Sequence, residues 1–508
     1  MKRTLMKGAY LLDPDLPLNK QDILIENDTI KGLSPNIIDE ADIVIDVSDK
    51  IVSPGFISSH THTFNTPLRG LQNLPLYPWL ILIRHVYEKL GRDPRDLYLW
   101  NAIGATGLLK SGVTSLLEHG PYISPIGYES EVAATVKAFT DVGIRAVVCP
   151  GYRDVKFADC FPLYLLNNIT KEEIALLDVF PLMDADTLLG VLRSLLQNYA
   201  LSQDRPVSLG LGPIHAYRSS RKVIEGTVQL AGEFNVNVHS HLLETQLELI
   251  ESKKVLSKSA VQFLAEIGCL GPGFSFAHGV WLDDEDILTL VETKSSIVHN
   301  PVSNLKLGSG IAPLQKMREQ GLNVALGIDG TGGSNDSVNM FETMKYGAIT
   351  HNFYGTSRNW ISAEDAFRMC LTGGAKVLRK KIGSIRPGYK ADLVVLRTDR
   401  LFMMPKENLI NQLVFCDMGE SIDKVIVGGQ VVVENNEIKT VNENEVYREA
   451  RESIQRVYAS IKSLNEKASP ILKLLEKMTT LGENYESVNS SLLRRNSSLS
   501  HSSGGRIG

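Results

Sequence analysis

Histidine and acidic residues recur along the chain at spacings that suit metal binding. His60 and His62 stand two residues apart in SHTH, and His241 stands three residues before Glu244 in HLLE. Asp329 directly follows the apolar run NVALGI. Imidazole nitrogens together with one carboxylate oxygen form a ligand set that suits Zn²⁺ and also Fe²⁺. An HxH pair alone is a weak signal, so this prediction depends on the elements that bring the residues together.

Short apolar strands alternate with helical stretches through the middle of the chain. The predicted strands are 55–62, 112–119, 145–151, 207–213, 236–241, 274–280, 295–301 and 323–329. Eight buried strands with helices between them are what a parallel barrel requires. We therefore predict the α/β class and a TIM-like (β/α)8 barrel.

The candidate ligands stand at the ends of these strands. His60 and His62 end the first strand, His241 the fifth and Asp329 the eighth, while His278 and His299 lie near the ends of the sixth and seventh. Functional groups gather at the carboxyl ends of barrel strands. Residues two apart on a strand share one face, so His60 and His62 can reach the same ion.

Strand-rich blocks flank the predicted barrel and indicate the domain organisation. The predicted units are a β-sandwich from residues 1–54 and 385–440, the barrel at 55–384, a helical extension at 441–480 and a disordered Ser-rich tail at 481–508. The tail is too polar to bury a core. Residues 152–205 are too long for a simple connection, which predicts a lid.

Composition excludes several classes of function. The net charge of −5 argues against a nucleic-acid-binding protein, which needs a basic face. No run of about 18 apolar residues occurs, so no membrane span is expected. The five cysteines include no CxxC pair, and the first 13 residues lack the apolar core of a secretory signal. These features favour a cytoplasmic protein in a reducing compartment.

Several longer motifs together carry a family resemblance. PGFISSHTHTFNTPLRG, HSHLLET, FAHGV, HNPVSNLKLGSGIAPL, ALGIDG and GYKADLVVL closely resemble the deaminase and chlorohydrolase branch of the amidohydrolase superfamily. This branch includes methylthioadenosine and S-adenosylhomocysteine deaminases, guanine deaminases and triazine hydrolases. The resemblance runs from about residue 1 to 440 and also implies a homo-oligomer.

The resemblance implies one divalent metal ion, Zn²⁺ with Fe²⁺ as an alternative. Its ligands would be His60, His62, His241 and Asp329. Other superfamily branches hold two metals bridged by a carboxylated lysine on strand four, but VSLGLGP contains no lysine. The family ligand stands three residues before the glutamate, which selects His241 and gives His239 a structural role.

The resemblance also implies catalytic roles for Glu244, His278 and Asp329. A bound metal lowers the pKa of its water towards 7 and makes hydroxide available for attack. Glu244 would then relay a proton to the substrate, and Asp329 would act as a ligand and second base. His278 would stabilise the oxygen electrostatically. The alternative for Glu244 is a solvated glutamate at a helix start.

Four residues are candidates for substrate binding. Trp79 belongs to an aromatic loop that either sandwiches a flat heterocycle or packs only against itself. Arg153 would pair with an acidic or carbonyl substituent. Asn335 lies in a loop that resembles triazine and guanine-type members, and His299 would reach the pocket or support the ligands.

The predicted reaction is hydrolytic removal of an exocyclic amine from a purine, pterin, triazine or related heterocycle. The same site could instead release a halide, an alkylamine or open a cyclic amide. A non-catalytic scaffold is the alternative from another class. Adenosine-type deaminases often read GPHSPY after strand four, whereas this chain reads GPIHAY. Ile214 thus replaces a histidine, and His215 follows it.

Overall fold

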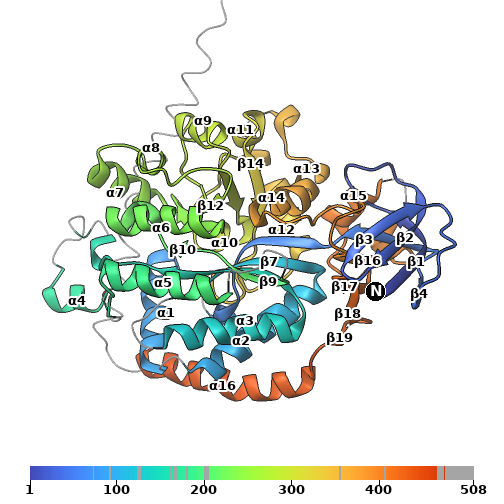
Figure 1. Ribbon diagram of the computed structural model, residues 1–508. Helices are drawn as coiled ribbons and strands as arrows, with labels where there is room; N and C mark the ends of the chain where they lie inside the picture. The colour runs from blue at the N-terminus through green and yellow to red at the C-terminus, as the bar shows by residue number, and fades with distance from the viewer. Residues whose placement is uncertain are drawn as a thin grey trace, which may run out of the picture.

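The computed structural model describes residues 1–71, 74–90, 93–122, 127–160, 163, 169–178, 181–199, 205–353, 356–404, 408–465, 474 and 477. A ring of parallel strands surrounded by helices forms one part, and a sheet beside it carries the N-terminus (Figure 1). The predicted tail at 481–508 and most of 466–480 lie outside the described residues.

Parallel strands close into a barrel. They are β6 (Phe56–His62), β7 (Val113–Tyr122), β8 (Arg145–Tyr152), β9 (Val207–Leu209), β10 (Gly212–Pro213), β11 (Val238–Leu242), β12 (Phe274–His278), β13 (Ser296–His299), β14 (Asn323–Leu326) and β15 (Asp329–Gly330). The fourth strand of the barrel is formed by β9 and β10 together, and the eighth by β14 and β15 together. A parallel bridge between Leu211 and Val238 and the pairing of β15 with β6 complete the ring. The (β/α)8 prediction is confirmed.

Helices cover the outside of the barrel (Figure 1). They include α1 (Leu76–Leu90), α2 (Pro94–Lys110), α3 (Tyr128–Val142), α4 (Lys171–Ala175), α5 (Ala185–Tyr199), α6 (Arg221–Phe234), α7 (Gln246–Leu256), α8 (Ala260–Glu266), α9 (Asp284–Glu292), α10 (Pro301–Lys306), α11 (Leu314–Glu319), α12 (Met340–Ile349), α13 (Ala363–Arg368) and α14 (Gly374–Leu378). The start of α7 bears on the site, because Thr245 caps it by accepting a hydrogen bond from the Glu248 N–H. This cap fixes where strand β11 gives way to helix, directly after Glu244.

Strands from the two ends of the described chain share one sheet. The N-terminal strands are β1 (Arg3–Leu11), β2 (Lys20–Glu26), β3 (Thr29–Ser34), β4 (Ile43–Asp46) and β5 (Lys50–Pro54), and the C-terminal ones are β16 (Leu393–Arg397), β17 (Ile422–Val427), β18 (Gln430–Glu434) and β19 (Glu437–Ile438). β5 pairs with β16 in antiparallel register, which joins the two halves. The strands thus form one nine-stranded sheet. The sequence pattern predicts a β-sandwich for the same residues.

A buried ion pair joins this sheet to the barrel. Arg145 on β8 donates to both carboxylate oxygens of Asp392, at 2.6 and 3.0 Å. Asp392 also accepts from the Gly428 N–H at 2.7 Å. Paired, bidentate geometry of this kind satisfies two charges that burial would otherwise destabilise. Breaking the pair would leave an uncompensated charge between the two parts.

Helix α16 (Glu443–Asn465) packs against the barrel beside the loop that follows β6. The Trp100 indole N–H donates to the Ser453 hydroxyl at 2.8 Å, and Val457 and Ile461 pack in one cluster with Trp79 and Trp100. The helix therefore supports residues close to the mouth of the barrel. No helix among the described residues is long and apolar enough to cross a membrane.

Candidate functional site

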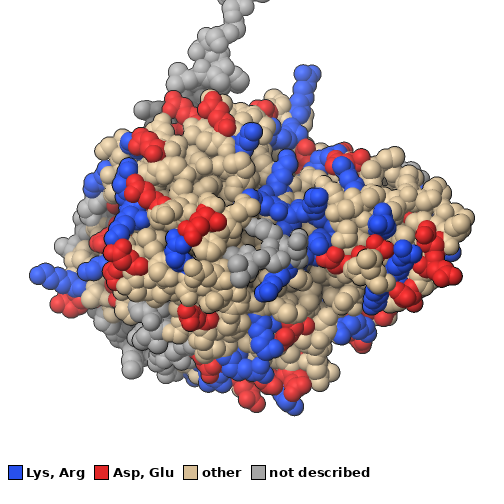
Figure 2. Space-filling model, in the orientation of Figure 1, with Lys and Arg blue, Asp and Glu red and all other residues tan. Residues whose placement is uncertain are grey.

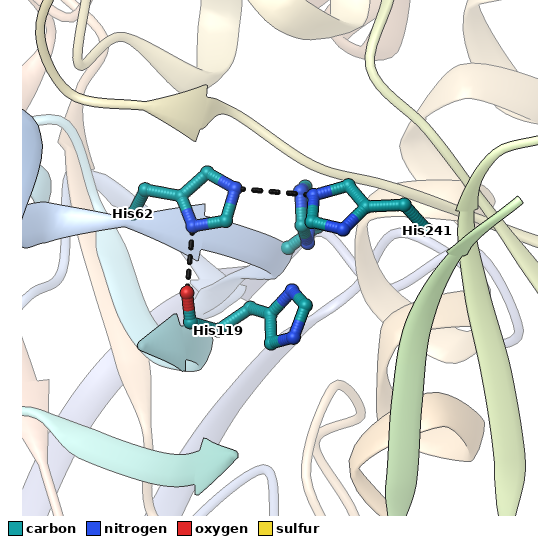
Figure 3. Close-up of side chains that lie close together, drawn as sticks. His62, His119 and His241 are labelled. Carbon is teal, nitrogen blue, oxygen red and sulfur yellow. Dashed lines mark hydrogen bonds between the residues drawn. The ribbon is translucent and has the colours of Figure 1, made fainter. Parts of the chain in front are cut away.

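Three histidines and one aspartate converge at the carboxyl ends of β6, β11 and β15. The Nε2 atoms of His60 and His62 lie 3.4 and 3.3 Å from Asp329 Oδ1. Nε2 of His241 lies 3.4 Å from Nε2 of His62, and the two rings face each other in Figure 3. All four side chains are buried. The four residues predicted as ligands thus lie near one another, and their donor atoms fall in two groups that share His60: one with His62, His119 and His241, and one with His278 and Asp329.

A left-handed backbone conformation occurs at two residues of this region, Asp329 and His278. Asp329 and His278 have φ angles of 67° and 74°, in the left-handed region that side chains other than glycine rarely adopt. Such strain persists only where the surrounding structure enforces it, and it is typical of functional sites.

The second nitrogen of each candidate ligand is held by the protein. Nδ1 of His62 donates to the His119 carbonyl at 2.7 Å, and Nδ1 of His241 donates to the Ile214 carbonyl at 2.9 Å. Nδ1 of His60 lies 2.8 Å from Nε2 of His239. Donation from Nδ1 leaves the Nε2 lone pair aimed at the shared centre, as metal ligation requires.

The donor set fits a divalent metal ion. Burial lowers the pKa of His60, His62 and His241, so these rings are neutral at pH 7 and can act as ligands. Among the described residues, His60 Nε2 is buried without a hydrogen-bond partner. The Ser303 hydroxyl donates to Asp329 Oδ2, which leaves Oδ1 facing the histidines. A set of three imidazole nitrogens and one carboxylate oxygen suits Zn²⁺ or Fe²⁺.

His119 lies at this centre, although it is not among the ligands expected from the sequence. It belongs to one group with His60, His62 and His241 whose donor atoms all lie within 4.8 Å of one another. Its Nε2 lies 3.1 Å from the Gly212 carbonyl oxygen. The signal for it in the sequence was its position at the end of the second predicted strand, which alone does not separate a structural histidine from a functional one.

Glu244 and His278 form a buried pair beside the cluster. Oε2 of Glu244 lies 3.5 Å from Nε2 of His278, and the Ser309 hydroxyl donates to Oε1 at 3.1 Å. Burial raises the pKa of Glu244 against the opposing effect of His278. For His278, burial disfavours the cation, but Glu244 and Asp329 outweigh it and raise the pKa. A buried carboxyl group with a raised pKa is suited to general acid–base chemistry.

Hydrogen bonds from neighbouring residues hold the Glu244 backbone and the His278 side chain. Glu248 accepts a hydrogen bond from the Glu244 backbone N–H at 2.6 Å and lies 3.3 Å from His215 Nε2. His278 Nδ1 lies 2.8 Å from the amide oxygen of Asn304. Sequence reasoning missed Ser303, Asn304, Ser309 and Glu248 as supports, because their roles depend on how α7 and α10 pack over the strand ends. Glu244 itself is buried and not a solvated residue at a helix start.

A largely apolar cavity opens from the cluster. Its empty volume, with the open mouth included, is about 1370 Å³. The residues that line it beyond the cluster include Phe64, Leu76, Trp79, Leu80, Ile83, Trp100, Arg153, Phe157, Met183, Leu188, Ile214 and His215. Aromatic and aliphatic walls with a few polar groups at one end are typical of small-molecule sites.

The four candidate substrate residues have different places. Trp79 and Arg153 line the cavity, and Arg153 lies over the Phe157 ring and 3.7 Å from Asp178. Asn335 does not line it: its side chain donates to the Ile328 carbonyl at 2.9 Å and accepts from the Ser337 N–H. His299 also lies outside the lining, with its Nε2 3.2 Å from that of His351.

Comparison with known sequences places the chain among hydrolases. The profile of the amidohydrolase family matches residues 51–432. The 5′-deoxyadenosine deaminase of Methanocaldococcus jannaschii is 33% identical over 442 residues, which cover 85% of this chain and 96% of that protein. A 5-methylthioadenosine/S-adenosylhomocysteine deaminase of Thermoanaerobacter pseudethanolicus is 34% identical over 468 residues, which cover 89% and 99%.

Solved structures show the same fold. Atrazine chlorohydrolase from Arthrobacter aurescens, in complex with zinc, has a TM-score of 0.80 and 22% identity, and the match covers 89% of this chain and 100% of that one. An adenosine deaminase from Xanthomonas campestris with bound zinc has a TM-score of 0.76 and 22% identity, with 90% and 98% covered.

Proposed function

The chain belongs to the amidohydrolase family, and from this premise we propose that it is a metal-dependent aminohydrolase acting on a purine-like heterocycle. Hydrolysis would replace an exocyclic amine by oxygen and release ammonia. Two relatives that are at least 33% identical over almost their whole length are deaminases, which supports this class of carbon–nitrogen hydrolase.

One observation carries the proposal most directly. The buried carboxyl of Glu244 lies beside His278 and opens into the same cavity as His62, His241 and Asp329. A divalent ion held by His60, His62, His241 and Asp329, which we take to be Zn²⁺ with Fe²⁺ as the alternative, would supply hydroxide at neutral pH. The proton-transferring group and the candidate ligands therefore face one space that a substrate can enter.

The residues of the chain then have distinct tasks. Protonated Glu244 delivers a proton to a ring nitrogen, which makes the carbon that carries the amine more electrophilic. Asp329 accepts a proton that is passed on to the departing amine. His278 stabilises the negative charge that develops on oxygen as the carbon becomes tetrahedral. One C–O bond forms, one C–N bond breaks, and water is consumed as ammonia leaves.

The residues that line the cavity favour a flat, weakly polar substrate. Trp79 and Phe157 provide aromatic surfaces, and aliphatic side chains such as Leu80, Met183 and Leu188 also line the cavity. Aromatic surfaces favour stacking with heterocycles. Ile214 offers no hydrogen bond to a ring, whereas adenosine-type members often have a histidine there, so recognition at this wall differs from theirs.

A substrate screen with two readouts tests the proposal. Metal-replete protein is incubated with amino-substituted purines, pterins and triazines and, in parallel, with chlorinated and alkylamino analogues. Ammonia release from an amino-purine is the expected result, because both relatives named above are adenosine-type deaminases. Release of chloride or alkylamine without ammonia would replace this proposal by the other leaving group. Turnover after complete metal removal would contradict metal dependence.

We also propose that the chain forms a homo-oligomer in the cytoplasm. The proposal rests on the family resemblance of the sequence, which implies an oligomer, and on cysteine usage that favours a reducing compartment. Basic and acidic side chains are interspersed over the face shown in Figure 2, whereas nucleic-acid binding would need a basic face. Light scattering at several protein concentrations would measure the mass, and a monomer at all of them would contradict an oligomer.

A further inference from the structure

The three histidine ligands are not held in the same way. His62 and His241 each donate from Nδ1 to a backbone carbonyl oxygen, at 2.7 and 2.9 Å. His60 alone has a side chain opposite its Nδ1, namely Nε2 of His239 at 2.8 Å. A carbonyl oxygen can only accept a hydrogen bond, whereas an imidazole nitrogen can accept or donate. The tautomer of His60 therefore depends on a second residue.

His239 is itself held from behind. Its Nδ1 lies 2.8 Å from the Ser275 hydroxyl oxygen. His239 on β11 and Ser275 on β12 are direct partners in the parallel register of these strands, so both side chains point to the same side of the sheet. His60, His239 and Ser275 are all buried, and the three groups form an unbroken chain from β6 to β12.

We propose that His239 is a positioning residue that holds His60 in the tautomer able to bind the metal. In that arrangement, His60 Nδ1–H donates to His239 Nε2, and His239 Nδ1–H donates to the Ser275 oxygen. The Nε2 lone pair of His60 then faces Asp329 and the other ligands. This inference rests on the proposed metal site and assigns a role to His239 and Ser275, which the proposed reaction does not use.

The reverse arrangement of the chain blocks metal binding. If the Ser275 hydroxyl donates to His239 Nδ1, then His239 Nε2–H donates to His60 Nδ1. The proton of His60 must then sit on Nε2 and point at the centre, where it would face Asp329 Oδ1 at 3.4 Å. A hydroxyl group can serve either arrangement, because it is both donor and acceptor. Metal binding selects the first arrangement, and His239 supplies the acceptor it needs.

Two substitutions of similar size separate positioning from packing. His239→Gln keeps a side-chain oxygen that can accept from His60 Nδ1, whereas His239→Leu fills the space without any acceptor. If His239 positions His60, the glutamine variant should bind Zn²⁺ about as tightly as wild type. The leucine variant should bind about 10–100-fold more weakly, the usual cost of losing a hydrogen-bonding partner of a ligand.

A double-mutant cycle tests the rest of the chain. Ser275→Ala leaves the buried His239 N–H without an acceptor in the metal-binding arrangement, so Zn²⁺ affinity should fall by about tenfold. In the His239→Gln background the same change should have little effect, because glutamine does not need Ser275 to orient a proton. The cycle stays informative even if the leucine variant does not fold.

Affinities are measured on metal-stripped full-length protein by competition with a chromophoric chelator. Absorption of the Co²⁺-loaded proteins reports whether the ligand geometry has changed. Equal Zn²⁺ affinity for wild type and His239→Leu would overturn the inference, as would equal losses in the glutamine and leucine variants or the same Ser275→Ala effect in both backgrounds. If wild type itself binds no Zn²⁺ or other divalent ion, the proposed function fails first and this inference falls with it.

Discussion

Replacing Glu244 by glutamine removes a titratable carboxyl while keeping the size of the side chain. The amide oxygen can still accept from the Ser309 hydroxyl, which lies 3.1 Å from Oε1 in the structure. The amide cannot take up a proton and return it to the substrate. General acid–base catalysis contributes about 10²–10⁴-fold, so kcat should fall by this factor. At about 1.36 kcal/mol for each tenfold change, the loss corresponds to about 2.7–5.4 kcal/mol of activation free energy.

The assay combines ammonia release with elemental analysis on the same preparation. Metal content of Glu244→Gln should match wild type, because all four proposed ligands remain. Glu251→Gln is a matched control: Glu251 is a buried glutamate in the middle of the following helix, α7, and does not line the cavity. The control should keep both its metal and its turnover.

Three outcomes separate the possible roles of Glu244. A helix-start residue without a catalytic role would cost at most about 1 kcal/mol of stability on substitution, with turnover nearly unchanged. Near-normal turnover in metal-replete Glu244→Gln would therefore refute proton transfer by this residue. Loss of metal together with turnover would mean that Glu244 is a ligand, and the assignment of the four ligands would be wrong.

Four further outcomes are expected. Asp329→Asn should sharply reduce both metal content and turnover, and wild type should hold one metal ion per chain by elemental analysis; two ions would contradict the mononuclear site. Trp79→Ala should raise KM for a flat substrate more than it lowers kcat, since the side chain lines the cavity but is neither a candidate ligand nor a proton-transfer group; steady-state kinetics would show an unchanged KM if Trp79, which lies on helix α1 and not in the expected loop, only packs against Trp100 and α16. Burial raises the pKa of Glu118 from 4.5 to about 8, so the folded state favours the protonated carboxyl. The contribution of Glu118 to the free energy of unfolding is therefore full below pH 4.5 and is lost as pH rises towards 8. Glu118→Gln should flatten this fall when the free energy of unfolding in urea is measured against pH, and an identical pH profile in the variant would refute the prediction. Removal of residues from 482 onward should leave turnover intact, because this polar segment cannot bury a core; a large loss with unchanged folding would show that it reaches the site.

The sequence could predict the barrel and which side chains end its strands, but not which way each of these side chains points. In SIVH, Val298 packs in the barrel interior with Ile57 and Leu117, so strand alternation directs His299 outwards towards His351. Both Ile297 and Val298 are apolar, and so the pattern did not reveal which one faces inwards. His299 could therefore be placed at a strand end from the sequence, but not on the correct face.

His278 shows the opposite case, in which alternation would have given the wrong direction. Ala277 is the register partner of the ligand His241, so a regular strand would turn His278 away from the centre. The left-handed φ of 74° rotates it back towards Glu244. The family resemblance implied the catalytic role of His278. Strand alternation could not predict it, because a hydrophobic pattern does not show that a single residue has a left-handed backbone conformation.

The positions of the proposed ligands follow from fewer parts of the fold than the positions of the candidate substrate contacts. The proposed ligands lie on barrel strands, whose ends meet at one face of any closed parallel barrel, so their convergence follows from the order of strands. Trp79 and Arg153 stand on connections whose paths depend on packing against α16 and on contacts such as that of Arg153 with Phe157. Local sequence carries little information about such paths. The choice of substrate therefore depends on segments outside the strands, while the chemistry is fixed by the strand ends.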